Sequence, residues 1–428
     1  MKLRRQKSTN VGSLPHLEPF DWLLLFFINT TMLRISVAYT IGPAAASFLY
    51  RVIAVVLAIA ITKHALKSRN VIDLILIVGL YLIAVMISIA MNPRLESILG
   101  VTLSKFLTCL GGYYLFSQCD ISRSLDRMTP YCAILILPYC ALILSSTSID
   151  HYNNSEYFGI SYGIVLQVCL LLLNNKHNII ILLSGILGTC VIIFAGARGA
   201  FLCVVVAAAL ALVFDLLKAG RHGRVLYILA TMVVAAMIIS LSDEMMVWLQ
   251  NLMPESRTLA RLTSENYGYD SSRLTMYQTL WDAIARDPFQ YRGVLSDRLV
   301  GANVWSHVML SGDGSLAGTY AHNIFFEVLY QNGVLLGSLI LVGLIYGLVH
   351  AYRFANSKEG SQELRLLAIL LGCGIAQLMV SSSYLINMHF WYLLGYVAST
   401  FRWSERESNG QDRHLLRKMH SSLGDISE

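Results

Sequence analysis

Residues 179–217 read IIILLSGILGTCVIIFAGARGAFLCVVVAAALALVFDLL, two apolar runs joined by a turn that carries Arg198. Each run is close to the roughly 20 residues that an α-helix needs to cross about 30 Å of hydrocarbon. Similar runs recur along the whole chain. This repetition predicts an all-α integral membrane protein.

The composition of the 428 residues agrees with a lipid-facing surface. Hydrophobic residues make up 56% and charged residues 14%, and the mean hydropathy is +0.59. Soluble domains carry about 25% charged residues, so these charges are too few to cover a water-facing surface. Composition therefore excludes a disordered chain, a secreted disulfide scaffold and a cytosolic enzyme. The eight cysteines form no C-x-x-C pair, so neither disulfides nor a zinc site is predicted.

The apolar runs predict about 12 transmembrane helices, nine within residues 20–242 and three within residues 321–402. The individual runs are 20–38, 46–62, 71–90, 98–116, 129–147, 159–173, 178–195, 200–217, 225–242, 322–349, 366–384 and 387–402. With the N-terminus inside, the segments expected in the cytoplasm hold 21 of the 32 basic residues. Because cytoplasmic loops are enriched in Lys and Arg, the tails 1–19 and 403–428 are both expected in the cytoplasm.

Residues 243–320 form one long connection of 78 positions on the outer, periplasmic side of this topology. Within it, residues 271–287 predict an amphipathic helix with one apolar face. The residues assigned to that face are Leu274, Tyr277, Leu280, Trp281 and Ile284. A loop of this length in a compact bundle is typically a lid or a binding element.

Three basic residues lie in or near predicted spans, where a charge is costly. Lys105 is about seven residues into its span, which favours a functional or paired side chain. Arg34 and Arg51 lie toward the outer ends of theirs. For these two arginines, a side chain that snorkels to the headgroups is an equally good interpretation.

The turn Phe194-Ala195-Gly196-Ala197-Arg198-Gly199-Ala200-Phe201 places Arg198 at the outer membrane boundary. Glycines on both sides allow other groups to approach the backbone closely. A guanidinium at this depth can form a bidentate fork on phosphate oxygens. The alternative is a simple anchor in a tight turn.

The stretch Tyr320-Ala321-His322-Asn323-Ile324-Phe325-Phe326-Glu327 marks the junction of the long loop and the tenth span. His322 can act as an acid or base, or can donate to a phosphate. Glu327 needs a partner or a wet cavity if it lies within the membrane. The alternative is a capping histidine and a structural Glu327–Asn323 pair. Arg273, in the first turn of the loop helix, is a weak signal by itself.

Three motifs occur together in the order seen in the O-antigen polymerase and O-antigen ligase superfamily. They are Ala197-Arg198-Gly199-Ala200, Ser271-Ser272-Arg273 followed by Trp281 and Asp287-Pro288, and Ala321-His322-Asn323 with the later Asn332-Gly333. The long outer loop late in the chain resembles that superfamily as well.

The resemblance implies a metal-independent glycosyltransferase in the bacterial inner membrane, without a cofactor, whose active site faces the periplasm. Its donor would be an undecaprenyl-pyrophosphate-linked oligosaccharide, and Arg198, Arg273 and His322 would be essential. Guanidinium groups would stabilise the charge of the departing pyrophosphate. His322 or Glu327 would take the proton of the acceptor hydroxyl, and both assignments stay open. The residues expected to bind pyrophosphate are Arg198, Arg273, His322, Lys105 and Arg51, with Asn323 and Gly199 in supporting positions.

The pattern favours a polymerase that joins lipid-linked repeat units over a ligase that transfers them to lipid A–core. A polysaccharide flippase or transporter is the third hypothesis. Transporters place their sites at the midplane of two related halves, whereas these polar residues gather near the outer boundary. The expected partners are the lipid-linked oligosaccharide and the bilayer. A chain-length regulator protein is a further candidate partner, and nucleic acid is not expected.

Overall fold

The structure is a computed structural model that describes residues 14–66, 71–118, 121–145, 159–174, 178–195, 197–218, 271–305, 319–358 and 361–404. The predicted span 225–242 lies outside these residues, as do loop residues 243–270 and 306–318 and most of both tails. Within the described residues the fold is entirely helical, with no strand.

The N-terminal half supplies α1 (Pro19–Thr40), α2 (Pro43–Ala65), α3 (Val71–Met91), a 3₁₀-helix (Pro93–Ile98), α4 (Leu99–Phe116), α5 (Ile121–Ser145), α7 (Val165–Leu173), α8 (Ile179–Ala195) and α9 (Arg198–Lys218). The C-terminal half supplies α13 (Ser271–Arg286), α14 (Asp297–Trp305), α15 (Ile324–Ser357), α16 (Gln362–Leu371), a π-helical turn (Gly372–Ala376) and α17 (Gln377–Val380). A final helix covers residues 388–404.

Eight helical stretches of the described chain are long and apolar enough to cross a membrane. They coincide with the predicted spans at 20–38, 46–62, 71–90, 98–116, 129–147, 200–217, 322–349 and 366–384. Two predicted spans appear as shorter apolar helices, Gly159–Leu173 and Ile179–Ala195. An all-α, multi-pass membrane architecture is therefore confirmed, and the count of 12 stays a prediction.

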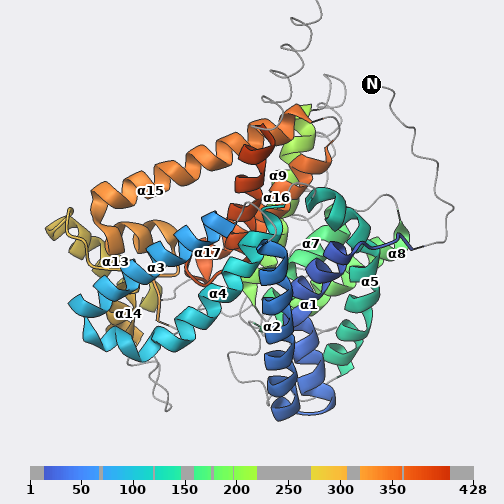
Figure 1. The fold of residues 1–428 in the computed structure, drawn as a ribbon, viewed down its shortest axis with the longest axis horizontal. Helices are drawn as coiled ribbons and strands as arrows, with labels where there is room; N and C mark the ends of the chain where they lie inside the picture. Colours follow the sequence, from blue (N-terminus) through green and yellow to red (C-terminus); the bar gives the residue numbers. More distant parts are fainter. Residues whose placement is uncertain are drawn as a thin grey trace, which may run out of the picture.

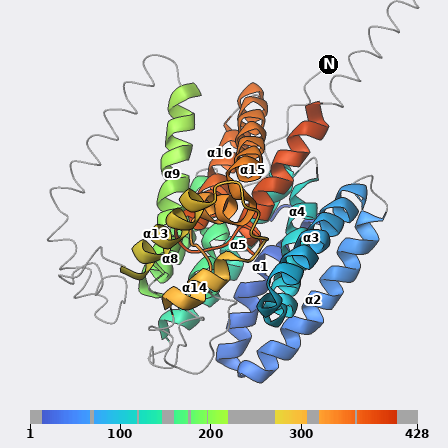
Figure 2. The same cartoon turned by 90° about the vertical axis from the view of Figure 1, so that its left-hand side faces the viewer.

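The largest core joins α1, α2, α5, α7, α8, α9, α16 and the final helix. In Figure 1, α1 and α2 form a hairpin beside α5, α7 and α8. In Figure 2, α9 and α16 lie beside each other, and α15 meets α9 near its own C-terminal end, where Tyr352 contacts Phe214 (ring centroids 5.4 Å apart). The beginning of α9 and the short helix α17 are held on this bundle.

A second core lies on the other side of the molecule, where α3 and α4 pack against the loop before α14 and against the start of α15. Phe106 of α4 stacks on Tyr81 of α3, with ring centroids 3.7 Å apart. Val294, Leu295 and Ile324 are buried in the same cluster. This core fixes the described part of the long connection against the membrane helices.

Gly333 divides α15 into two helical segments, because its backbone leaves the helical region (φ 71°, ψ 166°). A Cβ at this position would lie 3.0 Å from the carbonyl oxygens of Phe289 and Gln290, and side chains rarely adopt this φ and ψ. Val334 N donates to the carbonyl of Pro288 (2.6 Å) at the same junction. Glu327 therefore lies on a short segment before the long membrane helix.

The helix predicted at 271–287 coincides with α13, but its buried face differs from the predicted one. Met276, Leu280 and Ile284 are the buried residues. Leu274 and Trp281, which were assigned to the apolar face, are exposed. The spacing i, i+4, i+8 follows the helical repeat more closely than the predicted set, so α13 is rotated toward Met276.

Arg292 holds the end of α13. Its guanidinium donates to the carbonyls of Ala283 (2.6 Å) and Asp287 (2.9 Å), and it lies over the ring of Tyr330 at 5.0 Å. Carbonyls at a helix C-terminus have no partner within the helix, so this arginine stabilises the chain reversal that returns α13 to α15.

Candidate functional site

His322 immediately precedes α15 in a left-handed backbone conformation (φ 55°). The helix cap is the next residue, Asn323, whose Oδ1 accepts from Phe325 N (2.9 Å) and Phe326 N (3.4 Å). The alternative of a capping histidine is therefore wrong. Asn323 therefore caps α15, and His322 lies just outside the helix.

Two arginines act on the imidazole of His322. Burial, Arg273 and then Arg298 lower the pKa of His322 to about 3. The ring of Tyr320 lies 4.3 Å from that of His322, and Tyr277 of α13 donates to the His322 carbonyl (3.4 Å). The site therefore presents a neutral imidazole beside two guanidinium charges.

The turn at Arg198 joins the same region through Tyr162. Gly199 packs directly against the Tyr162 hydroxyl, which forms a hydrogen bond with Ser381 Oγ. The Arg273 charge acts on Tyr162 as well as on Tyr320. A side chain at position 199 would displace Tyr162, so close packing explains why this position is a glycine. Arg198 itself is exposed at the first residue of α9.

Two buried carboxylates lie next to this cluster. Asp297 accepts from Ala321 N (2.9 Å) and from Gln331 Nε2 (2.6 Å), and the same amide nitrogen lies 3.5 Å from Glu327 Oε1. Ser383 Oγ and Tyr384 N donate to Glu327. Burial raises the pKa of Asp297, and the charge of Arg298 opposes this change. The predicted Glu327–Asn323 pair does not form, because these partners occupy Glu327.

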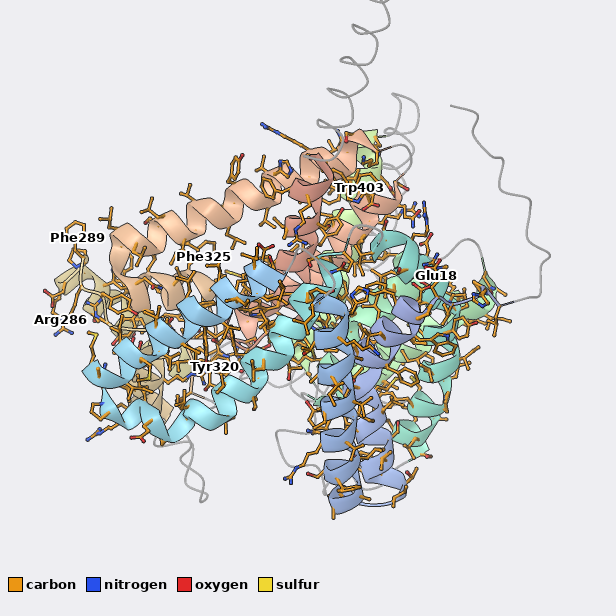
Figure 3. The ribbon with its side chains drawn as sticks, viewed as in Figure 1. Glu18, Arg286, Phe289, Tyr320, Phe325 and Trp403 are labelled. Carbon is orange, nitrogen blue, oxygen red and sulfur yellow. The ribbon has the colours of Figure 1, made fainter. Side chains whose placement is uncertain are left out.

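Arg298 is the residue of this cluster that the sequence did not single out. It is only 1% exposed, and its guanidinium lies over the ring of Tyr320 at 5.4 Å. Its charge acts on Asp297, Glu327 and His322. Figure 3 shows Tyr320 among packed side chains, whereas Arg286 and Phe289 project at the edge of the molecule. An arginine in a long outer loop is ordinary in sequence, so only its burial identifies it.

Lys105 and Arg51 differ in their relation to the cluster. Lys105 is exposed on α4, and the charge of Arg298 acts on it. Arg51 is exposed on α2, next to Tyr50, whose ring Arg34 covers at 5.5 Å. Among the contacts of the described residues, none joins Arg51 to His322 or Arg273.

The fold defines a multi-pass membrane protein. Its cationic site is formed by Arg273 and Arg298 beside His322. A family model described as O-antigen ligase matches residues 183–342, a range that includes Arg198, Arg273 and His322. This match supports the resemblance to the O-antigen polymerase and ligase superfamily, whose members are glycosyltransferase-like enzymes of polysaccharide biosynthesis. Comparison with curated proteins gives no significant match.

Proposed function

We propose that this protein is an O-antigen polymerase, which joins undecaprenyl-pyrophosphate-linked repeat units on the periplasmic face of the inner membrane. The observation that carries the proposal is the grouping of His322 with the ring of Tyr320, 4.3 Å away, and with the charges of Arg273 and Arg298, which act on its imidazole. Anions with two phosphates suit such a site, because guanidinium groups bind phosphate oxygens in pairs. A chain-length regulator remains a candidate partner.

Arg198 and Arg273 bind the pyrophosphate in this mechanism, and Lys105 and Arg298 add positive charge behind it. As the bond from the sugar C1 to the pyrophosphate oxygen breaks, that oxygen keeps the electron pair. The arginines stabilise this charge more strongly in the transition state than in the bound substrate, which lowers the barrier. Arg51, exposed on α2, stays a candidate for a further phosphate contact, although no contact among the described residues joins it to the cluster.

His322 is the better of the two candidate bases. Burial first, and then the charges of Arg273 and Arg298, lower its pKa to about 3, and a negative donor offsets the part that the arginines cause. Donor binding therefore makes the imidazole a stronger base at the moment when the acceptor hydroxyl must lose its proton. That oxygen then bonds to C1 while undecaprenyl pyrophosphate leaves.

Glu327 has a positioning part in this proposal. Its carboxylate is occupied by Ser383, Tyr384 and Gln331, which ties α15 to the loop after α17. A buried carboxylate with three neighbouring donors is poorly placed to take a proton from a sugar. It keeps the turn that carries His322 in place.

An O-antigen ligase is the second candidate, because the matching family model is described by that activity. The lipopolysaccharide band pattern of a deletion strain distinguishes the hypotheses. Loss of a polymerase leaves core plus one repeat unit. Loss of a ligase leaves bare core with accumulated lipid-linked polymer. A flippase mutant accumulates lipid-linked repeats on the cytoplasmic side, and that result would end the enzyme proposal.

The proposal also requires a periplasmic site. Gly220 and Gly314, which lie outside the described residues, are expected on opposite sides of the membrane. A cysteine at Gly314 should react with an impermeant thiol reagent from the periplasm, and a cysteine at Gly220 should not. The reverse pattern would place the site on the cytoplasmic face and contradict the proposed donor.

A further inference from the structure

A cavity of about 180 Å³ is lined by residues of the loop 381–387, next to the site of Arg273, Arg298 and His322. Its walls come from α1, from residues 159–166, from α17 with the following loop, and from the start of the final helix. No Asp, Glu, Lys or Arg is among its described lining residues. Uncharged polar groups line it instead, chiefly Tyr162, Gln377, Ser382, Asn387 and His389.

One side chain in this wall has a donor without an acceptor. Asn387 is 2% exposed, and its Oδ1 accepts from Phe390 N (2.9 Å) as the cap of the final helix. Its Nδ2 is buried and has no hydrogen-bond partner among the described residues. Buried amide groups are nearly always paired in native proteins, so this nitrogen indicates a ligand or water in the cavity.

The remaining walls suit a polyhydroxylated ligand. His389 Nδ1 donates to Gln377 Oε1 (2.9 Å), which leaves the other polar atoms of both side chains for a further partner. Tyr392 adds part of an aromatic side chain to the wall, and Ser382 adds a hydroxyl. Ligand sites for whole drug-sized molecules measure about 300–1,000 Å³, so this cavity has room for a single ring.

The loop 381–387 lies between the charged residues around Glu327 and the uncharged cavity. Ser383 and Tyr384 contact Glu327 of the charged network, whereas Ser382, Ile386 and Asn387 line the cavity. Tyr162 belongs to both regions, because it lines the cavity and bonds to Ser381 beside Gly199. A ligand in the cavity is thus a close neighbour of the cationic site and avoids its charges.

We propose that this cavity, built around the buried amide of Asn387, binds one neutral sugar ring of a saccharide chain that is held at the arginine site. This inference rests on the proposed function. The ring belongs either to the donor or to the acceptor, since both carry the same chemistry.

A kinetic test uses Asn387→Ser in the full-length protein. Serine is also a good helix cap, so the final helix keeps its first hydrogen bond while the amide donor is lost. The KM for lipid-linked repeat units should rise at least fivefold with kcat within twofold. Asn178 caps α8 in the same way through Ile180 N (3.0 Å), so Asn178→Ser is the matched control and should leave KM unchanged. Equal KM values for both variants would overturn the inference.

A protection test identifies the occupant. Ser382→Cys introduces a thiol into the cavity wall, and its reaction with methyl methanethiosulfonate is measured against wild-type protein. The lipid-linked repeat should slow this reaction at least fivefold, and undecaprenyl pyrophosphate without sugar should not. Protection by undecaprenyl pyrophosphate alone, or by neither compound, would contradict a sugar site. Arg286→Cys, on the exposed end of α13, should not be protected by either compound.

The source of the ring follows from a third probe, the free oligosaccharide repeat. Protection by this probe in the presence of undecaprenyl pyrophosphate assigns the ring to the acceptor. Protection by the lipid-linked repeat and not by the free repeat assigns the ring to a substrate that is held through its lipid pyrophosphate. If wild-type protein does not convert lipid-linked repeats, the proposed function fails. If wild-type protein converts them, but Asn387→Ser keeps the wild-type KM and the thiol of Ser382→Cys is not protected, only the sugar cavity fails.

Discussion

Replacing Arg273 with glutamine should raise the pKa of His322. In the wild type, burial, Arg273 and Arg298 lower this pKa from 6.5 to about 3. The difference corresponds to about 5 kcal/mol against protonation of the ring, at 1.36 kcal/mol for each pH unit. Arg273 is the second cause after burial, so its removal recovers less than half of the difference. The pKa in Arg273→Gln should therefore rise but stay below about 5.

Deuterium exchange at the carbon between the two imidazole nitrogens, followed by mass spectrometry of the peptide that contains His322, measures this pKa without any substrate. The exchange rate reaches its plateau above the pKa of the ring. Arg298→Gln should give a smaller rise than Arg273→Gln, because its effect on His322 is the smaller one. Arg286→Gln, at the exposed C-terminal end of α13, is the matched control and should change nothing.

Binding of undecaprenyl pyrophosphate should raise the same pKa in wild-type protein, since its negative charge offsets the arginines. The rise should be smaller in Arg273→Gln, which holds the anion less well. A wild-type pKa near 6.5 would refute the buried, arginine-flanked environment. A pKa that Arg273→Gln leaves unchanged would show that Arg273 does not act on the imidazole.

Three further predictions concern the charge chemistry and the fold. Arg198→Lys and Arg273→Lys should each abolish most polymer laddering at normal membrane levels, because an ammonium cannot form the bidentate fork; wild-type ladders would contradict the site. Activity of purified protein on lipid-linked repeats should survive EDTA, and a loss that Mg²⁺ restores would contradict an arginine-based mechanism. Gly333→Ala should destabilise the protein by about 1–3 kcal/mol, because its backbone conformation is essentially restricted to glycine. Gly343→Ala should not lower the thermal midpoint, because a Cβ added at Gly343 would meet no neighbouring residue within 4 Å.

The fold class was predictable because the bilayer imposes a simple rule on the sequence. A span needs about 20 apolar residues, and that requirement is visible in any single stretch such as 179–217. The helices at the predicted spans follow from it, whereas the helix that begins at Ser271 follows from the periodicity of its apolar residues. The buried face of α13 was less predictable, because Leu274 and Met276 are both apolar and only packing against Ala321 selects Met276.

The sequence by itself determined the class of architecture, the superfamily and the polar residues worth testing, because those depend on local composition and on motifs in order. Tertiary structure alone decided that Arg298 is buried, that Glu327 bonds to Ser383, and that Asn387 lines a cavity. Each of these features brings together residues from distant segments, such as Glu327 and Ser383. No local pattern distinguishes a buried arginine from a solvated one, since burial depends on which distant helices pack against it.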